Sequence, residues 1–453
     1  MVGHSDVTEA PMDEHDVVIV GARCAGSPLA TMLANAGVDV CVVDQARFPS
    51  DTLSTHIVQA HGSAFLERLG LRDTLLDVGS VEIEQFTLIN DDVRVDGGPG
   101  PEDLPPLCVR RVTLDEVLVK AAETAGADVR TRTKVTGLIH DDDRVVGVET
   151  GDGPIRARLV VGADGMRSNV AEWAGAQEYH AVPGGRMMGV AYFEGVADSA
   201  GHLRIGRVGD NAFIAAPADG GQYMVGIGIS LSETSEFTAD RDASFDRGLR
   251  AWPELADLIA GSTRVGPIKM ITEWHSFFRE AAGPGWALLG DAGHFKDFTP
   301  GQGISDAFRQ ADHLAPAIIA GLGSDLGGGM DGELRRWWAW RDDDAWDMYW
   351  FAADLGSAGG STPLETRILR NLAKRPDGAI ELFQVFDHQV PPSEVFTKPR
   401  LALASFQALF DRPGKFGPTL REIVAAAKEE RRRERIRPPS TEPLRLPASV
   451  GAT

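Results

Sequence analysis

The sequence predicts an α/β fold, with further parts that make it α+β as a whole, and three observations support this fold class. Residues 16–44 have the pattern of a strand, a glycine-rich turn, a helix and a second strand. Residues 286–318 repeat the order of apolar strand, acidic glycine-rich loop and helix. A chain of 453 residues exceeds what one hydrophobic core usually supports, so two or three domains are expected.

The composition is that of a folded globular protein and disfavours some classes of partner. Hydrophobic residues make up 43% of the chain and charged residues 25%. The 66 acidic and 45 basic residues give a formal net charge of -21, which disfavours nucleic acid and anionic membranes as partners. No apolar stretch approaches the ~20 residues of a membrane span, and the leader at 1–14 is polar, so we expect a cytoplasmic protein without a membrane span.

The three cysteines, Cys24, Cys41 and Cys108, are widely spaced and form no CxxC pair. Cysteines in such an arrangement are typical of reduced thiols in the cytosol. The sequence therefore predicts free thiols and no metal site.

The order of predicted elements begins with the run VVIV at 17–20, whose continuous apolar character is typical of a parallel strand covered on both faces. Apolar spacing then predicts helices and strands, and glycine and proline predict a loop between them. These elements are a helix at 62–77, a loop at 91–106, a helix at 110–127, strands at 134–139 and 144–149, and an apolar strand opening the run RLVVGADG at 158–165.

Alternating stretches between residues 186 and 231 predict a β-rich insertion. Beyond residue 330 the sequence predicts a tryptophan-rich helix, an apolar helix near 401–410, a charged helix ending in EERRRERIR, and a proline-rich disordered tail. We therefore expect a polar leader (1–14), a discontinuous nucleotide-binding domain (15–80, 105–185 and 271–330), a substrate domain (81–104 and 186–270), a C-terminal helical region (331–435) and a tail (436–453).

The turn GARCAG matches a dinucleotide-binding fingerprint at Gly21 and Gly26, where the chain must turn tightly and the helix must pack closely on the strand. Arg23 stands where the fingerprint has its middle glycine, although a helix N-terminus at this place still favours an anion. Asp44 ends the second strand, where a carboxylate can accept both ribose hydroxyls. The turn indicates a Rossmann-type nucleotide site, and an ordinary α/β unit is the alternative.

Two further runs, LVVGADGMRS and WALLGDAGHFKDFTPGQG, resemble the DG and GD elements of FAD-dependent hydroxylases and follow the glycine turn in the same order. By this resemblance residues 15–330 are similar to the para-hydroxybenzoate-hydroxylase-like flavoprotein superfamily. That superfamily includes aromatic hydroxylases, flavin-dependent halogenases and geranylgeranyl reductases. The resemblance implies a Rossmann-type FAD-binding domain with an inserted β-sheet substrate domain.

The resemblance also implies roles for individual residues. Asp291 would hold the ribityl chain, the turn from Pro300 to Gly303 would aim backbone N–H groups at the flavin's pyrimidine edge, and Arg111 would contact the FAD phosphates. A solvated arginine at a helix start is the alternative for Arg111. The expected FAD contacts are Gly21, Ala22, Arg23, Ala25, Gly26, Asp44, Arg47, Arg111, Val135, Asp164, Gly290, Asp291, Pro300, Gly301, Gln302, Gly303 and Ile304.

The loop RFPSDTLSTH matches, by position, a segment that passes beside the flavin ring in relatives. His56 in this loop is the candidate catalytic acid or base, and a merely hydrogen-bonded imidazole is the alternative. His294 would orient the GD loop. The expected substrate contacts are Tyr192, Phe213, Met224 and Phe298, with Met187 and Met188 as further candidates, and core packing is the alternative for each.

Several departures from the family patterns bear on the reaction. Phe298 replaces a proline of the GD element, and Ala171 stands where the DG element has an arginine that bears on nicotinamide handling. The halogenase pattern WxWxIP is missing, with only WWAWRD far downstream, and FIAAP stands where geranylgeranyl reductases carry YxWxFP. The tryptophan-rich helix would cap the pocket, support a homodimer or simply pack.

The resemblance favours a monooxygenase that is reduced by NADH or NADPH, reacts with O2 and hydroxylates a small organic substrate, aromatic or a secondary metabolite. No second nucleotide fingerprint is present, in keeping with a family that lacks a separate nicotinamide domain. The alternative is an FAD-dependent reductase or dehydrogenase of the geranylgeranyl-reductase type. A flavin-dependent halogenase and a non-catalytic flavin sensor are further alternatives.

Overall fold

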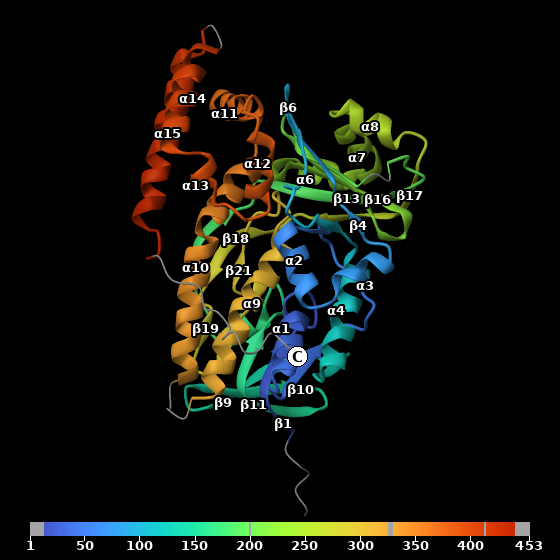
Figure 1. The fold of residues 1–453 in the computed structure, drawn as a ribbon, viewed down its shortest axis with the longest axis vertical. Helices are drawn as coiled ribbons and strands as arrows, with labels where there is room; N and C mark the ends of the chain where they lie inside the picture. Colours follow the sequence, from blue (N-terminus) through green and yellow to red (C-terminus); the bar gives the residue numbers. More distant parts are fainter. Residues whose placement is uncertain (1–12, 199–200, 325–328, 412–413, 440–453) are drawn as a thin grey trace, which may run out of the picture.

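The computed structural model describes residues 13–198, 201–324, 329–411 and 414–439. Two large sheets lie one above the other along the long axis, and the C-terminal helices lie beside the upper sheet (Figure 1). Most of the predicted leader, and residues 440–453 of the predicted tail, fall outside the described residues.

The lower sheet has eight strands, in the order β19-β20-β11-β1-β2-β8, with β10 pairing β11 and β9 pairing β10. β1 pairs in parallel with both β2 and β11, because Val17 to Ile19 are apolar and covered on both faces. Its strands are β1 (Glu14–Val20), β2 (Val40–Asp44), β8 (Asp128–Thr131), β9 (Val135–Asp141), β10 (Arg144–Thr150), β11 (Gly153–Gly162), β19 (Ala282–Gly283) and β20 (Trp286–Leu288). The predicted Rossmann-type α/β fold is thereby confirmed.

Helices cover this sheet and connect its strands. α1 starts directly at Gly26, where a Cβ would lie 1.9 Å from the carbonyl oxygen of Gly21, so only glycine permits this close packing. The helices near the sheet are α1 (Gly26–Asn35), α4 (Arg111–Ala125), α5 (Asn169–Trp173), the 3-10 turn η3 (Gly290–Ala292), α9 (Gly303–Leu322) and α10 (Gly329–Gly356).

The upper sheet has seven strands, in the order β17-β13-β16-β15-β14-β5-β6. Its strands are β5 (Gln85–Asn90), β6 (Val93–Gly97), β13 (Arg186–Glu194), β14 (His202–Val208), β15 (Asn211–Ala218), β16 (Gln222–Ser230) and β17 (Thr263–Ile271). One face of this sheet is covered by short helices, η2 (Leu231–Glu233), α6 (Thr234–Ala239), α7 (Arg241–Leu249) and α8 (Pro253–Ile259). The 3-10 turn η1 (Asp219–Gly221) links β15 to β16.

Two small sheets join the large ones. One consists of β12 (Glu178–Pro183), β18 (His275–Arg279) and β21 (His294–Phe295), and the other of β3 (Ile57–Val58), β7 (Leu107–Cys108) and β4 (Val81–Glu82). Because β5 and β6 precede the rest of the upper sheet by about a hundred residues, the chain visits that sheet twice. The domain boundaries expected from the sequence stay a prediction.

Two elements differ from the sequence-based expectation. The predicted helix at 62–77 is two helices, α2 (Ala60–Arg68) and α3 (Arg72–Asp77), because Gly70 takes a positive φ of 70° between them. The predicted loop at 91–106 contains β6, since Val93 and Val95 alternate into the core and pair antiparallel with β5. Proline and glycine interrupt the chain only after this short strand.

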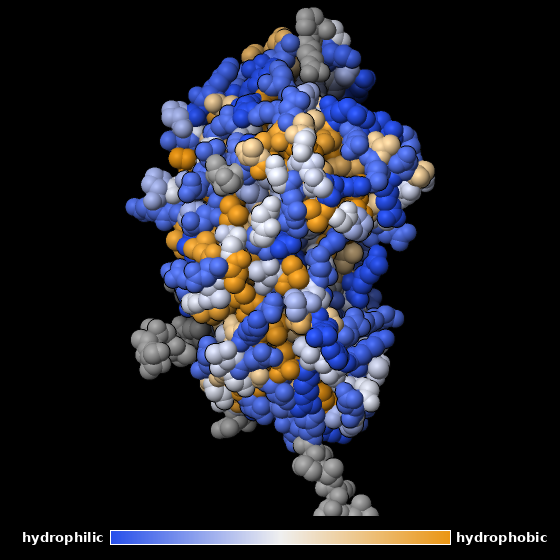
Figure 2. All heavy atoms as spheres, turned by 90° about the vertical axis from the view of Figure 1, so that its right-hand side faces the viewer, coloured by the Kyte–Doolittle hydropathy of each residue, from blue (hydrophilic) through white to orange (hydrophobic). Residues whose placement is uncertain are grey.

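The remaining helices are α11 (Pro363–Ala373), α12 (Gly378–Phe386), α13 (Pro392–Val395), α14 (Lys398–Asp411) and α15 (Phe416–Arg435). None of the described helices combines the length and hydropathy needed to cross a membrane. Figure 2 shows the face on the right-hand side of Figure 1, where hydrophilic residues predominate and hydrophobic residues appear between them over the middle.

The tryptophans of α10 point into the protein. Trp337 and Trp340 belong to the same buried cluster as Val17 and Ile19 of β1. Trp346 belongs to a separate buried aromatic cluster with Phe278. Core packing therefore explains this helix, and among the described residues that line the cavity below none belongs to α10.

Candidate functional site

A cavity of about 690 Å³ lies between the two large sheets, at the carboxyl ends of β1, β2 and β11. One end is formed by the glycine turn and by Asp44. The other end is formed by residues of β13 and β17 and by the loop that follows η3. The glycine-turn end is defined as Gly21, Asp44 and Arg111, with Asp115 behind Arg111, and the upper-sheet end as Met188, Val190, Lys296, Asp297, Phe298 and Asp306.

The glycine turn presses the backbone of β1 against the end of β11. Gly21 has a φ of 110°, and a Cβ there would lie 2.4 Å from the carbonyl oxygen of Ala163. Asp44 is held by two backbone N–H donors, from Ala22 at 2.8 Å and Ala46 at 2.7 Å. The Asp44 carboxylate is thus fixed at a strand end, beside a turn whose glycine has no side chain. Such an arrangement fits the ribose and phosphates of a dinucleotide.

Arg23, which replaces the middle glycine of the fingerprint, turns its side chain away from the backbone path. Its guanidinium donates to Asp115 at 2.8 Å and to Ser50 at 2.7 Å. Arg111 donates to the same Asp115 carboxylate at 2.9 and 3.0 Å. One buried carboxylate therefore orients two guanidinium groups that line the cavity, where they can meet the negative charge of phosphates.

Asp291 lines the cavity in η3, beyond the glycine-turn end. Burial raises the pKa of its carboxyl to about 6, with the Arg111 charge acting against the rise. The backbone N–H of the preceding Gly290 donates to the side-chain oxygen of Gln310 at 3.0 Å, which fixes the turn. Asp291 is enclosed and forms no ion pair with any described residue, so its carboxyl is suited to accept hydroxyl donors.

The N-terminus of α9 also opens on the cavity. Gly301, Gly303 and Ile304 line it, and no side chain caps the first turn of the helix. The neighbouring Pro300 and Gln302 fix the turn from behind, since the Pro300 carbonyl accepts from Gln59 and Gln302 donates to the carbonyls of Val385 and Phe386. Free N–H groups at this place would stabilise negative charge on a bound ring.

Buried charges lie at the upper-sheet end. The Lys296 ammonium lies 2.6 Å from the Asp306 carboxylate, and His388 lies 3.4 Å from its other oxygen. Burial acts to raise the pKa of Asp306, but Lys296 and His388 hold it well below its ordinary value. Asp297 has no such cation, and burial raises its pKa to about 6 although Thr299 donates two hydrogen bonds to it.

His56 is buried with a left-handed φ of 61°, and its Nε2 hydrogen-bonds the Tyr192 hydroxyl. Burial lowers the pKa of His56 to about 3, so the imidazole is neutral near pH 7. Its Nδ1 has no hydrogen-bond partner among the described residues. His56 is not in the cavity lining, whereas its neighbours Ser54 and Thr55 are. Burial also lowers the pKa of His294 well below its ordinary value.

The structure brings most of the expected cofactor residues together. The cavity lining includes Gly21, Arg23, Ala25, Asp44, Arg111, Val135, Asp164, Gly290, Asp291, Gly301, Gly303 and Ile304. Ala22, Gly26, Pro300 and Gln302 lie behind this lining and shape it. Arg47 is exposed and outside the lining.

The expected substrate residues divide between the two faces of the upper sheet. Phe298 and Met188 line the cavity, and Tyr192 and Met224 lie in the buried cluster on the same face. Phe213 and Met187 instead face the other side, where Phe213 packs edge-on against Trp252. The expectation that these two wall the pocket is corrected by the strand geometry, because neighbouring residues of a strand point to opposite faces.

Sequence reasoning missed Asp115, Lys296, Asp297 and Asp306. Asp115 stands four residues after Arg111 on α4, a spacing that predicts a helical ion pair. Asp306 stands on a helix among apolar residues, which is a signal of a buried partner. Lys296 and Asp297 carried no such local signal.

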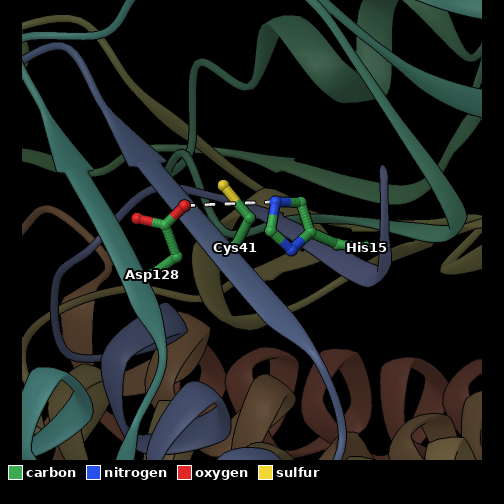
Figure 3. Close-up of side chains that lie close together, drawn as sticks. All are labelled: His15, Cys41 and Asp128. Carbon is green, nitrogen blue, oxygen red and sulfur yellow. Dashed lines mark ion pairs between the residues drawn. The ribbon is translucent and has the colours of Figure 1, made fainter. Parts of the chain in front are cut away.

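One group outside the cavity has metal-ligand residue types. His15, Cys41 and Asp128 have ligand atoms within 4.8 Å of one another at the edge of the lower sheet (Figure 3). His15 already bonds Asp39 at 2.9 Å, and the Arg130 guanidinium donates to Asp128 at 2.6 Å. Burial raises the pKa of Cys41 to about 12, so its thiol stays protonated. These contacts describe an ion-pair network.

The sequence matches the FAD binding domain family over residues 14–326. It is 29% identical over 330 residues to 6-methylpretetramide 4-monooxygenase of Streptomyces rimosus, covering 68% of this chain and 76% of that protein. It is 30% identical over 331 residues to menaquinone reductase of Mycolicibacterium smegmatis, again covering 68% of this chain and 76% of that protein.

The fold is similar to that of solved flavoproteins. The flavin-dependent brominase Bmp2 superposes with a TM-score of 0.72 at 18% identity, covering 92% of this chain and 99% of that one. A probable FAD-dependent monooxygenase of Pseudomonas aeruginosa, pqsL, gives 0.62 at 20% identity, covering 82% and 99%. The family match spans more than half of the chain and agrees with the glycine turn, Asp44 and the cavity, so the chain belongs to the FAD binding domain family, within the para-hydroxybenzoate-hydroxylase-like superfamily that the motifs indicate.

Proposed function

We propose that this protein is an FAD-dependent monooxygenase that uses NADH or NADPH and O2 to oxygenate a small organic substrate, aromatic or a secondary metabolite. The observation that carries the proposal is the division of one cavity into a backbone-lined end with Asp44 and Arg111, and an upper-sheet end where an apolar wall stands beside buried charges. The similarity to 6-methylpretetramide 4-monooxygenase supports the choice of reaction.

The residues present fit FAD. In the proposed arrangement Asp44 accepts the ribose hydroxyls, Arg111 meets the phosphates, and Asp291 accepts hydroxyls of the ribityl chain. The N-terminus of α9 would meet the flavin ring, where its free N–H groups favour negative charge. Bound FAD supplies the electron transfer and the reaction with O2.

The upper-sheet end would hold the organic substrate. Met188, Val190 and Phe298 offer apolar contact there, together with Met270 and Ile271 of β17. This wall excludes water from the reacting centre and positions the substrate opposite the α9 N-terminus. Lys296 adds one buried cation, which can orient a substrate oxygen.

His56 acts through Tyr192 in this proposal. Its neutral imidazole shares a hydrogen bond with the Tyr192 hydroxyl at Nε2, while Nδ1, which has no partner among the described residues, can make one further hydrogen bond as donor or acceptor, according to the tautomer. Tyr192 lies in the same buried cluster as Met188 and Val190, which line the cavity. His56 is therefore a positioning residue in this proposal.

The second candidate is an FAD-dependent reductase of the geranylgeranyl-reductase type. It is favoured by relatives that include menaquinone reductases at 30% identity and a digeranylgeranylglycerophospholipid reductase of Methanosarcina mazei at 31% over 172 residues. The apolar wall would then bind an isoprenoid chain.

The test separates the two by the fate of oxygen. The purified protein, loaded with FAD, is supplied with NADH or NADPH and a panel of polycyclic phenols and isoprenoid quinones, once with isotopically labelled O2 and once without oxygen. A monooxygenase incorporates label into the product and is inactive without oxygen. Unlabelled product formed without oxygen would instead establish the reductase.

Variants tie this activity to the site. Asp44→Asn should weaken FAD binding about tenfold, because the ribose loses a charged acceptor. Arg47→Ala is the matched control, since Arg47 is exposed and outside the cavity lining. Equal FAD affinity of both variants and the unmodified protein would contradict the proposed orientation of the cofactor.

A further inference from the structure

The hairpin of α14 and α15 carries a row of large hydrophobic side chains on its outer surface. Phe406 is 64% exposed and Phe410 65%, values far above those of core phenylalanines. The apolar stripe is defined as Leu403, Phe406, Phe410, Phe416, Leu420 and Val424. In the described part of the chain, only Val78 and Ile436 are other large hydrophobic residues of comparable exposure. Single exposed residues are ordinary, but a contiguous row marks a contact surface.

The stripe is continuous across the hairpin. Phe406 and Phe410 have ring centroids 5.3 Å apart, and Phe410 lies 6.0 Å from Phe416 on the other helix. The inner sides of the helices are used elsewhere, since Ala404, Ala408 and Thr419 are buried. The hairpin lies at one edge of the molecule and reaches its upper end (Figure 1). The high exposure of its phenylalanines leaves the stripe open to a large flat partner.

Basic residues continue the same face of α15 beyond the apolar stripe. Residues 416, 420, 424, 428, 431 and 435 follow one another at intervals of three or four, which places them on one side of the helix. Lys428, Arg431 and Arg435 are exposed and have no hydrogen-bond or ion-pair partner among the described residues. By contrast Arg433, on the inner side, pairs with Asp354 and stacks on Trp350.

The local charge opposes that of the whole chain. Residues 398–437 hold eleven basic and five acidic side chains, within a protein of net charge -21. Charges at a surface act over about 10 Å at ordinary ionic strength, so the hairpin presents a positive field although the protein is acidic. The net charge of the whole chain, which disfavours anionic membranes as partners, therefore does not describe the local charge of this surface.

We propose that the outer face of the α14–α15 hairpin binds the surface of a bilayer that contains anionic phospholipid. The phenylalanines enter the interface between headgroups and acyl chains, and the basic residues of α15 meet the headgroup phosphates. A second copy of this chain suits the surface less well, because an isologous contact would bring two positive hairpins together.

Acidic helices limit how the protein can dock. The segment 234–259, which contains α6, α7 and α8, holds six acidic and three basic residues, and these helices lie across the upper end from the hairpin (Figure 1). Anionic lipid would repel them, so the molecule should tilt onto its hairpin edge.

The test is co-sedimentation of the FAD-loaded protein with vesicles of phosphatidylglycerol and phosphatidylcholine, compared with vesicles of phosphatidylcholine alone. We expect binding to the anionic vesicles that is at least about tenfold stronger and that weakens as salt is added. The triple variant Phe406→Ser, Phe410→Ser, Phe416→Ser should bind about tenfold less or weaker still. The double variant Lys428→Glu, Arg431→Glu should lose the preference for anionic lipid.

Matched controls come from elsewhere on the surface. Val78→Ser removes an exposed apolar residue outside the hairpin, and Arg156→Glu reverses an exposed charge on β11. Both should bind vesicles as the unmodified protein does, and the FAD spectrum of each variant reports its folding. Equal binding to neutral and anionic vesicles, or none to either, would overturn the proposal. So would a dimer, measured by light scattering, that the triple phenylalanine variant converts to a monomer.

Discussion

The two ends of the cavity are built in different ways. At the glycine-turn end, backbone groups and one carboxylate, Asp115, fix the position of every charged side chain. At the upper-sheet end, an apolar wall stands beside the buried Lys296 and Asp306 pair and the uncompensated Asp297. The glycine-turn end is therefore suited to one constant ligand, because backbone groups define it. At the upper-sheet end, substitution of side chains alone can alter which substrate fits.

The largest effect is expected from a side chain added in the glycine turn at the first end of the cavity. Gly21→Val should abolish FAD binding, because a Cβ would meet the Ala163 carbonyl at 2.4 Å in a backbone with φ of 110°. Gly37→Ala is the control, since Gly37 also has a positive φ, of 79°, but open space around it. It should cost about 1 kcal/mol of unfolding free energy and leave FAD binding intact. Retention of FAD by Gly21→Val, measured by absorbance after gel filtration, would disprove this assignment.

At the upper-sheet end, Lys296→Met should lower the unfolding free energy at pH 7 by about 3–5 kcal/mol, because it strands a buried carboxylate. The pKa of Asp306 is lowered in the folded protein, so its contribution is present above the pKa of an unfolded carboxyl and is lost as pH falls through the folded value. The difference between variant and parent in denaturant melts should therefore shrink below about pH 4. Lys374→Met, at an exposed helix end, is the control and should change little at any pH.

Asp291 lies between the two ends of the cavity. We expect its buried carboxylate to lower the unfolding free energy of the FAD-free protein and to favour FAD binding. Its pKa is raised to about 6, so the folded protein takes up a proton that the unfolded chain lacks, and stability falls as pH rises from about 4 to 6. Asp291→Asn removes this cost and should raise the unfolding free energy of the FAD-free protein above pH 6 by about 3 kcal/mol. Below about pH 4 the two proteins should melt alike. A less stable variant at pH 8 would show that Asp291 has a partner that compensates its charge.

The smallest effect is expected at Asp115. Asp115→Asn keeps its shape but loses the charge that orients Arg23 and Arg111, and FAD should bind about tenfold more weakly. Glu116→Gln, next along the helix, breaks only the exposed pair with Lys120 and should leave the affinity unchanged. Flavin fluorescence titration measures both. An unchanged affinity for Asp115→Asn would mean that the guanidinium groups find their position without this carboxylate.

The sequence predicted the glycine turn and Asp44 because they lie close together along the chain, whereas Asp115, on the later helix α4, was missed. Gly21, Gly26 and Asp44 belong to one strand-turn-helix-strand unit, whose geometry follows from local rules. The Lys296 and Asp306 pair also lies within a short segment, but its third partner, His388, comes from a distant helix connection. No local sequence pattern predicts a contact with a residue so far along the chain.

Phe213 illustrates a different reason for failure. All but the first residue of β15 are buried, because α7 and α8 cover one face of the sheet and residues of α12 pack in the cluster on the other face. Alternation of polar and apolar residues, which usually tells the inner face of a strand from the outer, is then absent. Tertiary packing decides which face of the sheet meets the cavity. It places Met188 in the cavity lining and Met187 on the opposite face.

The burial of the α10 tryptophans shows that the folded core extends beyond the residues that the family match covers. The family match ends at residue 326, yet Trp337 lies in the same core cluster as β1, and the end of α10 at Gly356 leaves no room for a Cβ beside Asp297. A chain shortened to the matched region would lose a wall of its own interior and should melt in a broad transition without a cooperative midpoint.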